Sequence, residues 1–239
     1  MRPIAPSLHH LHRIRISNVY LLDDGPGNRW LIDCGHFVER PTLLRELRAA
    51  GIGPGDLRGV LLTHRHSDHA GNAAFLQRRF GAAIHAHRAD AAILDGTAPR
   101  QALRRGRGSR IAGLLAAIEN RLPARVYVDR ALEDGDTVAG LEVHWVPGHT
   151  EGSLFFRHPP TGSLFSGDML LAARPPLTLR QGLAPPYSTY TVDLAQAFES
   201  LRAFHARAVP YENLLSGHGR PLLGGARGKV IELLRRETR

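Results

Sequence analysis

The sequence predicts an α/β fold in which helices pack outside stacked β-sheets. Short strand-like apolar runs alternate with helical patterns along nearly all of the 239 residues, and this alternation is typical of layered α/β domains. A chain of this length buries a sizeable core as one domain, and the sequence shows neither a linker nor a tandem repeat. We therefore expect a single domain over residues 1–239.

The strand-like and helical runs follow one another in a regular order. An early hairpin is indicated by the apolar runs 18–22 and 30–34, and the run 59–62 has the composition of a buried strand. Strands are expected at residues 14–22, 29–33, 59–62, 83–86, 137–146, 154–157, 163–166 and 213–216, and helices at residues 41–50, 70–80, 111–122, 191–205 and 226–236. The Gly- and Pro-rich stretches 23–28, 51–55 and 174–186 are expected to be loops.

One dense group of potential metal ligands lies between a predicted strand and a predicted helix. It reads Thr-His-Arg-His-Ser-Asp-His and supplies His64, His66, Asp68 and His69. Ligand loops of open α/β structures lie at the carboxyl ends of strands, which is the place this group occupies. On a tight loop the first two histidines can point the same way while the last two ligands diverge, an arrangement that suits two ions. The alternative is a polar strand-to-helix loop.

Three further potential ligands each follow a strand-like run. His149 comes after the alternating apolar residues 141–146, and His218 lies between two glycines after residues 213–216. Asp168 follows Gly167, which has no side-chain bulk and lets the backbone approach closely. A carboxylate in this place has two oxygens and can bridge two metal ions. A strand end followed by a potential ligand thus recurs along the chain.

Five imidazoles and two carboxylates in this order predict a hydrolytic site with two metal ions. These donors suit zinc, iron or manganese. Two neighbouring cations convert a shared water into hydroxide near neutral pH. The sequence therefore predicts an enzyme that uses two divalent metal ions, with Zn²⁺ as the first choice and Fe or Mn as alternatives.

With these motifs the sequence resembles the metallo-β-lactamase-fold hydrolases. The likeness is to the glyoxalase II-like subgroup, which has His-x-His-x-Asp-His, a later His, a bridging Asp and a final His. The early hairpin is also similar, because it ends in Asp33-Cys34-Gly35 where the family has Asp-x-Gly. The resemblance covers nearly the whole chain and implies the four-layer αββα sandwich of the metallo-β-lactamase fold.

The resemblance also implies a role for each ligand. It implies that the first ion is bound by His64, His66 and His149. The second ion would be bound by Asp68, His69 and His218. Asp168 and a hydroxide would bridge the two ions, and this hydroxide would attack an ester, thioester or lactone carbonyl. Asp68 is expected to be catalytic by accepting or shuttling a proton. Asp33 is expected to steady the ligand loop without touching metal, with a turn residue as the alternative.

The expected cellular compartment follows from two features that the sequence lacks. Residues 1–15 lack the apolar stretch of a signal peptide, and no run approaches about 18 apolar residues. A cytoplasmic protein without membrane association is therefore expected. Cys34 is the sole cysteine, so it cannot form an internal disulfide and is expected to pack as a small hydrophobe. A reactive role beside the predicted metal pocket is the alternative for this thiol.

The formal net charge of +9 is weak evidence for nucleic-acid binding, because Lys229 is the sole lysine among 31 basic residues. That imbalance indicates an arginine bias of the whole chain. One local cluster consists of Arg100, Arg104, Arg105, Arg107 and Arg110. It is interpreted as a solvated loop or as a basic rim that attracts anionic substrates. Tyr187 and Tyr190, in a Pro-rich segment after Asp168, either cap the core or supply a hydroxyl to the substrate.

The sequence narrows the substrate without identifying it. Only 21 residues follow His218, fewer than the glutathione-binding region of glyoxalase II needs. Leu171 stands where lactonases of this fold commonly carry tyrosine, and Asp168 argues against a β-lactam. The expected partner is a small acyl compound, which would be anionic if the arginine cluster attracts it. The alternatives are a phosphodiesterase or nuclease acting on nucleic acid, and a persulfide dioxygenase with one iron held by His64, His149 and Asp168.

Overall fold

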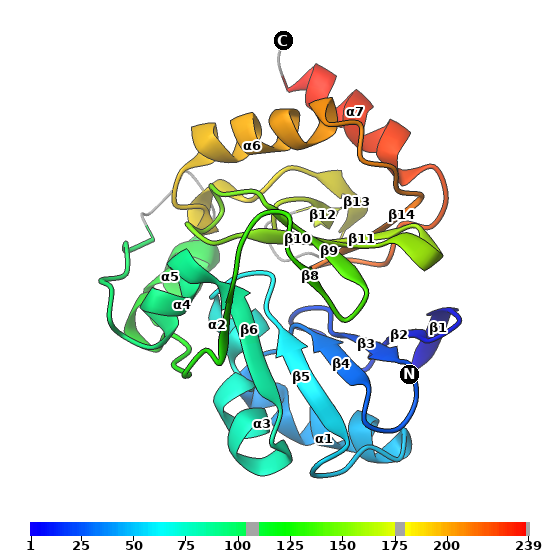
Figure 1. Ribbon diagram of the computed structural model, residues 1–239. Coiled ribbons are helices and arrows are strands. Elements are labelled where there is room, and N and C mark those ends of the chain that lie inside the picture. Colours follow the sequence, from blue (N-terminus) through cyan, green and yellow to red (C-terminus); the bar gives the residue numbers. More distant parts are fainter. Residues whose placement is uncertain (104–109, 175–179, 238–239) are drawn as a thin grey trace. The chain divides into compact units, whose positions relative to one another are not determined.

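The computed structural model describes residues 1–103, 110–174 and 180–237 (Figure 1). The chain divides into two compact units. Unit 1 comprises Met1–Pro99 and Pro123–Leu132, and unit 2 comprises Arg100–Leu122 and Glu133–Arg239. The expectation of a single domain over residues 1–239 stays a prediction.

Unit 1 is built on a seven-stranded sheet whose strands lie in their order along the sequence. They are β1 (Arg2–Ala5), β2 (Leu8–His10), β3 (Tyr20–Asp23), β4 (Arg29–Ile32), β5 (Leu57–Leu61), β6 (Ala83–His87) and β7 (Arg130–Leu132). The pairs from β1 to β4 are antiparallel, and those from β4 to β7 are parallel. Because β4, β5 and β6 run the same way, their carboxyl ends meet at one edge of the sheet.

Helices cover one face of this sheet. Unit 1 contains η1 (Phe37–Glu39), α1 (Arg40–Ala49), α2 (Ser67–Ala70), α3 (Ala73–Phe80) and α4 (Arg88–Leu94). Figure 1 shows α1 and α3 along the same side of the central strands. Leu43 and Leu47, one turn apart on α1, join Leu76 of α3 and the strand residues Val60 and Ile84 in one buried cluster. The helical and strand periodicities thus bury matching apolar faces.

Unit 2 contains a five-stranded sheet in the order β14-β11-β10-β9-β8 and a separate strand pair. The five strands are β8 (Thr137–Val138), β9 (Leu141–Trp145), β10 (Leu154–His158), β11 (Ser163–Gly167) and β14 (Asn213–Ser216), and the pair is β12 (Leu171–Arg174) with β13 (Arg180–Ala184). Strands β11 and β14 pair in parallel, and the other described neighbouring strands pair antiparallel.

The described helices of unit 2 are η2 (Pro159–Thr161), α5 (Arg110–Arg121), η3 (Ser188–Tyr190), α6 (Leu194–Ala206) and α7 (Ala226–Arg236). Helices α6 and α7 lie side by side along one face of the five-stranded sheet (Figure 1). Leu201 and Phe204 of α6 and Val230 of α7 bury their side chains with Phe155 and Leu214 of the sheet. The apolar stripe of each helix therefore faces the sheet.

The predicted fold class is confirmed, whereas two predicted strands need correction. The run 14–22 becomes a strand only at Tyr20, because the N–H groups of Arg15 and Ile16 donate to the Glu39 carboxylate instead of to a neighbouring strand. The run 137–146 is interrupted at Ala139, whose φ of 51° turns the chain between β8 and β9.

The predicted helix 70–80 is also interrupted, and other elements were not predicted. Helix α2 ends at Ala70 and α3 begins at Ala73, because Gly71 and Asn72 contact the loop after β4. The sequence analysis missed β1, β2, β7, β12 and α4. The predicted loop 174–186 contains β13, which pairs with β12. Among the described residues, no helix is long and apolar enough to cross a membrane.

Candidate metal centre

The first ligand group forms a buried loop in unit 1, directly after β5. The side chains of His64, His66 and His69 are nearly inaccessible, with exposed fractions of 2%, 4% and 0%, and the carboxylate of Asp68 is 26% exposed. The ring centroid of His64 lies 4.8 Å from that of His66 and 4.1 Å from that of His69. The structure thus brings the predicted ligands of this group together at the edge where the parallel strands end.

Asp33, just after β4, orients two of these imidazoles. Its Oδ2 lies 2.7 Å from Nδ1 of His69 and accepts a 2.8 Å hydrogen bond from Oγ1 of Thr63. Because the Thr63 hydroxyl donates to Asp33, it can accept from Nδ1 of His64, 3.0 Å away. Both imidazoles thereby keep Nε2 for a metal ion, a pattern common at metal sites. The prediction that Asp33 steadies the ligand loop is confirmed.

Arg65, between two predicted ligands, is anchored by Asp90 of α4. The two side chains are 1% and 0% exposed. Asp90 Oδ2 accepts a 2.9 Å hydrogen bond from the Arg65 N–H, and its Oδ1 lies 3.6 Å from Nε. Helix α4 begins at Arg88 because the ring of His87 accepts from the N–H of Ala89. Sequence reasoning missed this anchor because it did not predict α4.

Asn72 and Cys34 join the loop after β4 to the ligand loop. The amide of Asn72 donates to the carbonyls of Cys34, Gly35 and His36 at 2.9, 3.2 and 3.1 Å. The Cys34 thiol donates to the carbonyl of His69 at 3.0 Å. Burial raises the pKa of this thiol, so it stays protonated. The prediction that Cys34 packs as a small hydrophobe is confirmed, and the structure gives no support to a reactive thiolate.

Unit 2 brings the remaining three predicted ligands together. Asp168 Oδ2 lies 3.2 Å from Nε2 of His218 and 3.8 Å from Nε2 of His149. On the other side of the His149 ring, Nδ1 lies 3.1 Å from Oγ1 of Thr191, which donates to the carbonyl of Tyr187. Thr191 therefore accepts from Nδ1, and Nε2 of His149 is directed toward the carboxylate.

Glycines allow these ligand loops to lie close to their neighbours. Gly148 has a φ of 133°, and a Cβ there would lie 2.3 Å from the backbone N of Ala197 in α6. Gly219 has a φ of 90°, and a Cβ there would lie 2.4 Å from the carbonyl carbon of Ala172 in β12. Larger side chains at either position would push His149 or His218 away from its place.

The donors of both units fit a divalent metal ion by their chemistry. Unit 1 offers imidazole Nε2 atoms and the Asp68 carboxylate, and unit 2 offers two more imidazoles and Asp168. Neutral imidazole and carboxylate suit zinc, iron and manganese. The hydrogen bonds that Asp33 and Thr191 make to ring nitrogens are those that hold ligating histidines in one tautomer.

Two segments were considered as possible borders of the site, the arginine cluster and the segment with Tyr187 and Tyr190. The described residues include only part of them. Arg104, Arg105 and Arg107 lie outside the described residues, and Arg110 is described only as the backbone at the start of α5. Arg100 lies 2.6 Å from Glu119 of α5, an ion pair in which both side chains are 10% exposed, so its charge is compensated. The rings of Tyr187 and Tyr190 lie 5.6 Å apart beside η3, both half-buried. A hydroxyl contact to substrate stays a prediction.

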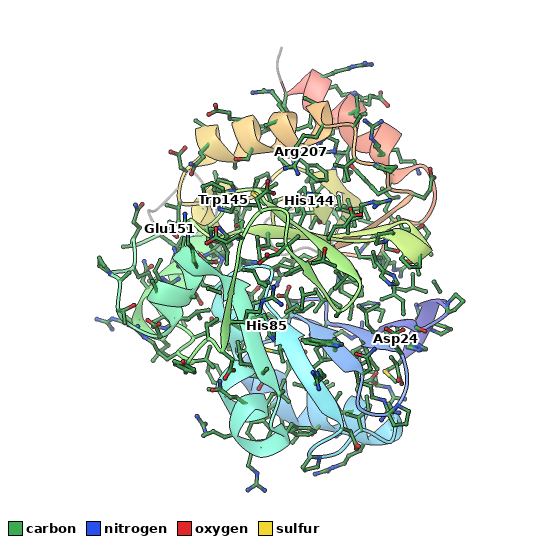
Figure 2. The ribbon with its side chains drawn as sticks, viewed as in Figure 1. Asp24, His85, His144, Trp145, Glu151 and Arg207 are labelled. Carbon is green, nitrogen blue, oxygen red and sulfur yellow. The ribbon has the colours of Figure 1, made fainter. Side chains whose placement is uncertain are left out.

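Two histidines outside the ligand motifs, His144 and His36, make contacts that belong to the fold. Figure 2 shows His144 on β9 and Arg207 just after α6. Arg207 Nη2 lies 3.2 Å from Nδ1 of His144, and the ring of Phe204 lies 5.2 Å from the imidazole. Burial lowers the pKa of His144, which is therefore neutral at pH 7. His36 caps η1 by accepting from the Val38 N–H.

Comparisons with known proteins agree on one family. The sequence model of the metallo-beta-lactamase superfamily matches residues 12–212. Two Bacillus subtilis proteins are named probable metallo-hydrolases. YflN is 27% identical over 97% of this chain and 91% of its own length, and YybB is 25% identical over 77% and 72%. A hydroxyacylglutathione hydrolase from Pseudomonas aeruginosa is 32% identical over 53% of this chain, which spans only 44% of that relative.

Solved structures give the same result. The metallo-beta-lactamase family protein TTHA1429 from Thermus thermophilus superposes with a TM-score of 0.70 at 25% identity, covering 99% of this chain and 81% of that one. TTHA1623, solved in a di-iron-bound form, has a TM-score of 0.63 at 26% identity and covers 89% and 92%. With the ligand motifs and the family match over most of the chain, the protein belongs to the metallo-β-lactamase superfamily and is a metal-dependent hydrolase.

Proposed function

We propose that the protein is a dinuclear metallohydrolase that cleaves an ester, thioester or lactone. The observation that carries the proposal is the convergence of His149 and His218 on one oxygen of Asp168, at 3.8 and 3.2 Å. A carboxylate between two imidazoles is the arrangement expected for a ligand that bridges two ions. The proposed ligands are His64, His66, Asp68, His69, His149, Asp168 and His218.

Ligands from both units are assigned to one site because of the family and because of the order of the ligands in the sequence. Zinc is the proposed metal, and the di-iron form of TTHA1623 supports iron as the alternative. When bound, two such ions lower the pKa of water to about 7 and polarise the scissile carbonyl. Because a metal-bound water would supply the nucleophile, the proposal gives the protonated Cys34 thiol no part in the reaction.

The side chains of the site have separate tasks in this mechanism. Asp33 fixes the tautomers of His64 and His69, so that both direct Nε2 to the metal. Thr191 does the same for His149. Asp68 is the most exposed of the proposed ligands on its loop, and its Oδ2 lies 3.6 Å from Nε2 of His69. This exposure supports the proposed role of Asp68, which is to take up the proton that water would release on attacking the carbonyl.

The acyl class of substrate is supported by the named relatives. The hydroxyacylglutathione hydrolases that match this chain are thioester hydrolases by their name. Because the chain spans 44% to 48% of the two relatives' lengths, glutathione itself is not part of the proposal. A small thioester is the preferred substrate class, and an anionic group on it would be attracted by the net positive charge of +9.

Metal content and activity on one purified sample test the proposal. We expect about two zinc or iron ions per chain by elemental analysis, hydrolysis of an acyl thioester, and no cleavage of a phosphodiester. Loss of turnover in His66→Ala and Asp168→Ala, with a folded protein by circular dichroism, is expected because each removes a ligand. His9→Ala, in a strand far along the chain from every ligand motif, is the matched control and should keep full activity.

Other outcomes would replace the proposal. Phosphodiester cleavage without thioester hydrolysis would indicate a nuclease of the same fold. One iron per chain with consumption of oxygen and a persulfide would indicate a dioxygenase. Near-normal turnover by either ligand variant would overturn the assignment of that residue.

A further inference from the structure

Three exposed apolar side chains lie beside the ligand loop in unit 1. They are Ile16, Phe37 and Val38, with exposed fractions of 39%, 43% and 56%, and we call them the apolar rim. Tyr127 is the other large hydrophobic residue of unit 1 that is exposed to this degree, at 67%. Hydrophobic residues exposed singly are ordinary, whereas a group of them marks a contact surface.

One carboxylate joins the two segments of the apolar rim. Oε1 of Glu39 accepts from the N–H of Arg15 at 2.8 Å, and Oε2 accepts from the N–H of Ile16 at 3.0 Å. Glu39 ends η1, the short helix that carries Phe37 and Val38. The backbone of Ile16 is thereby held to the short helix of Phe37 and Val38, which lie 21 and 22 positions further along the sequence.

The apolar rim is preformed. The ring of Phe37 stacks on that of His36, with 4.3 Å between centroids, and His36 Nδ1 accepts from the N–H of Val38. Asn72 fixes the carbonyl of His36 at 3.1 Å. Because these side chains stand on a fixed backbone, binding to them costs little ordering entropy.

The apolar rim is continuous with the ligand loop. Ser17 follows Ile16 directly, and its hydroxyl donates to the carbonyl of Asp68 at 2.5 Å. Asn72, which fixes the loop before Phe37, is three residues beyond His69. The backbone on both sides of the apolar rim is therefore tied to the segment that carries the proposed ligands of unit 1.

The size of the apolar rim identifies its occupant. A stable protein interface buries about 800 Å² on each partner. Even an aromatic side chain such as Phe37 buries only about 150 to 250 Å² when fully covered. Ile16 and Val38 are smaller, and the three side chains of the apolar rim are only 39% to 56% exposed. A hydrocarbon chain of several carbons matches this area far better than a protein does.

We propose that the apolar rim binds the hydrocarbon chain of the acyl group, so that the enzyme prefers medium-length acyl thioesters to acetyl thioesters. The proposal rests on the proposed function and adds the substrate class. Burial of one methylene against an open apolar surface increases kcat/KM by about two- to fourfold. The preference should stop rising once the chain extends beyond the apolar rim.

Acyl thioesters of N-acetylcysteamine with two to ten carbons test the proposal on the metal-loaded protein. We expect kcat/KM for octanoyl to exceed that for acetyl by at least about 30-fold. Phe37→Ser and Val38→Ser should each reduce this ratio about five- to tenfold, because both remove apolar area without touching a proposed ligand. Tyr127→Ser, which removes an exposed hydrophobe elsewhere in unit 1, should leave the ratio unchanged. Circular dichroism verifies that the variants are folded.

A second measurement separates failure of this proposal from failure of the proposed function. Decanoate binding to the metal-free protein is measured by calorimetry, and it should weaken in Phe37→Ser and Val38→Ser but not in Tyr127→Ser. An octanoyl-to-acetyl ratio near one, or a ratio that both variants preserve, would overturn the role of the apolar rim. If no thioester is hydrolysed, the proposed function fails. In that case the binding role of the apolar rim is supported if the variants weaken decanoate binding, and it is overturned if they do not.

Discussion

Asp33 shows how much of the site depends on one residue. Its φ of 57° lies in the left-handed region, which costs a residue other than glycine about 1 to 2 kcal/mol. In return its carboxylate accepts from the N–H and hydroxyl of Thr63, both at 2.8 Å, and lies 2.7 Å from Nδ1 of His69. The strained backbone is therefore maintained by contacts that serve the ligand loop.

Replacing Asp33 by Asn should weaken metal binding about 10- to 100-fold while the protein stays folded. Asn tolerates the left-handed conformation, but its NH2 group replaces one carboxylate oxygen. That NH2 group would face either the Thr63 N–H or the Thr63 hydroxyl with His69 Nδ1, and these donors need an acceptor. Competition with a chelator measures the affinity. Asp24→Asn, on the exposed turn between β3 and β4 (Figure 2), is the control. Equal affinities in the two variants would contradict the orienting role.

Arg65 and Asp90 form a buried ion pair, so removing one charge should cost more than removing both. Asp90→Asn removes the countercharge that lies 3.6 Å from Arg65 Nε, with an expected loss of about 3 to 5 kcal/mol in the free energy of unfolding. The double variant Arg65→Met with Asp90→Asn should regain part of that loss, because no uncompensated charge stays buried. Urea unfolding of the metal-free proteins measures both values. A double variant less stable than the single one would refute this account.

His10 makes stability depend on pH. Burial lowers its pKa from 6.5 to about 4, against a hydrogen bond to Asn18 that acts in the opposite direction. In the unfolded chain the imidazole takes up a proton near pH 6.5, so this contribution to stability is present above that pH. It is lost as the pH falls toward 4. His10→Gln should therefore show a shallower decrease in melting temperature between pH 6.5 and 4 than the wild type.

At the scale of elements, the order of helices and strands was largely predictable, whereas their interruptions were not. Helix α1, helix α7 and β14 follow the apolar periodicity of the sequence closely. The interruption between α2 and α3 depends on Asn72, whose amide donates to carbonyls 36 to 38 residues away in the sequence. Local periodicity contains no information on such a contact.

Two glycines with different surroundings test the account of the ligand loops. Gly148→Ala should destabilise the protein by about 3 kcal/mol or more and lower metal affinity, because the added Cβ meets α6 at 2.3 Å and the φ is 133°. Gly113→Ala, within α5 and with no atom within 4 Å of the added Cβ, should stabilise by about 0.5 to 1 kcal/mol. Thermal unfolding of both variants measures these opposite effects.

At the scale of the whole molecule, the sequence identified the family and the candidate ligands but not their supports. The ligand motifs are short and contiguous, so they are legible in the sequence. Asp90, Thr191 and Glu39 act through contacts across loops and belong to no motif. Asp33 was predicted because it belongs to the Asp-x-Gly ending of the hairpin. The substrate preference that we propose for the apolar rim was the least predictable property, because it depends on exposed side chains such as Phe37 that belong to no motif.

Metal ions should stabilise the folded protein by mass action. At a free concentration of 100 times the dissociation constant, the expected gain is about 2.7 kcal/mol. A chelator should lower the melting temperature accordingly, and zinc should restore it. His66→Ala in unit 1 and His218→Ala in unit 2 should each abolish most of this response if both units supply ligands to one site. A full response in either variant would show that the replaced residue binds no metal.

The linear strand order of unit 1 has a consequence for synthesis on the ribosome. Strands β1 to β6 can pair as they emerge, because each strand from β2 onward pairs with the strand synthesised just before it. Strand β7 begins about 40 residues after β6 ends, a delay of about 2 to 8 seconds at common translation rates. During that interval the edge of β6 has no partner strand in unit 1. We expect chains arrested before Arg130 to be cut by protease near β6, and chains arrested well beyond Leu132 to resist.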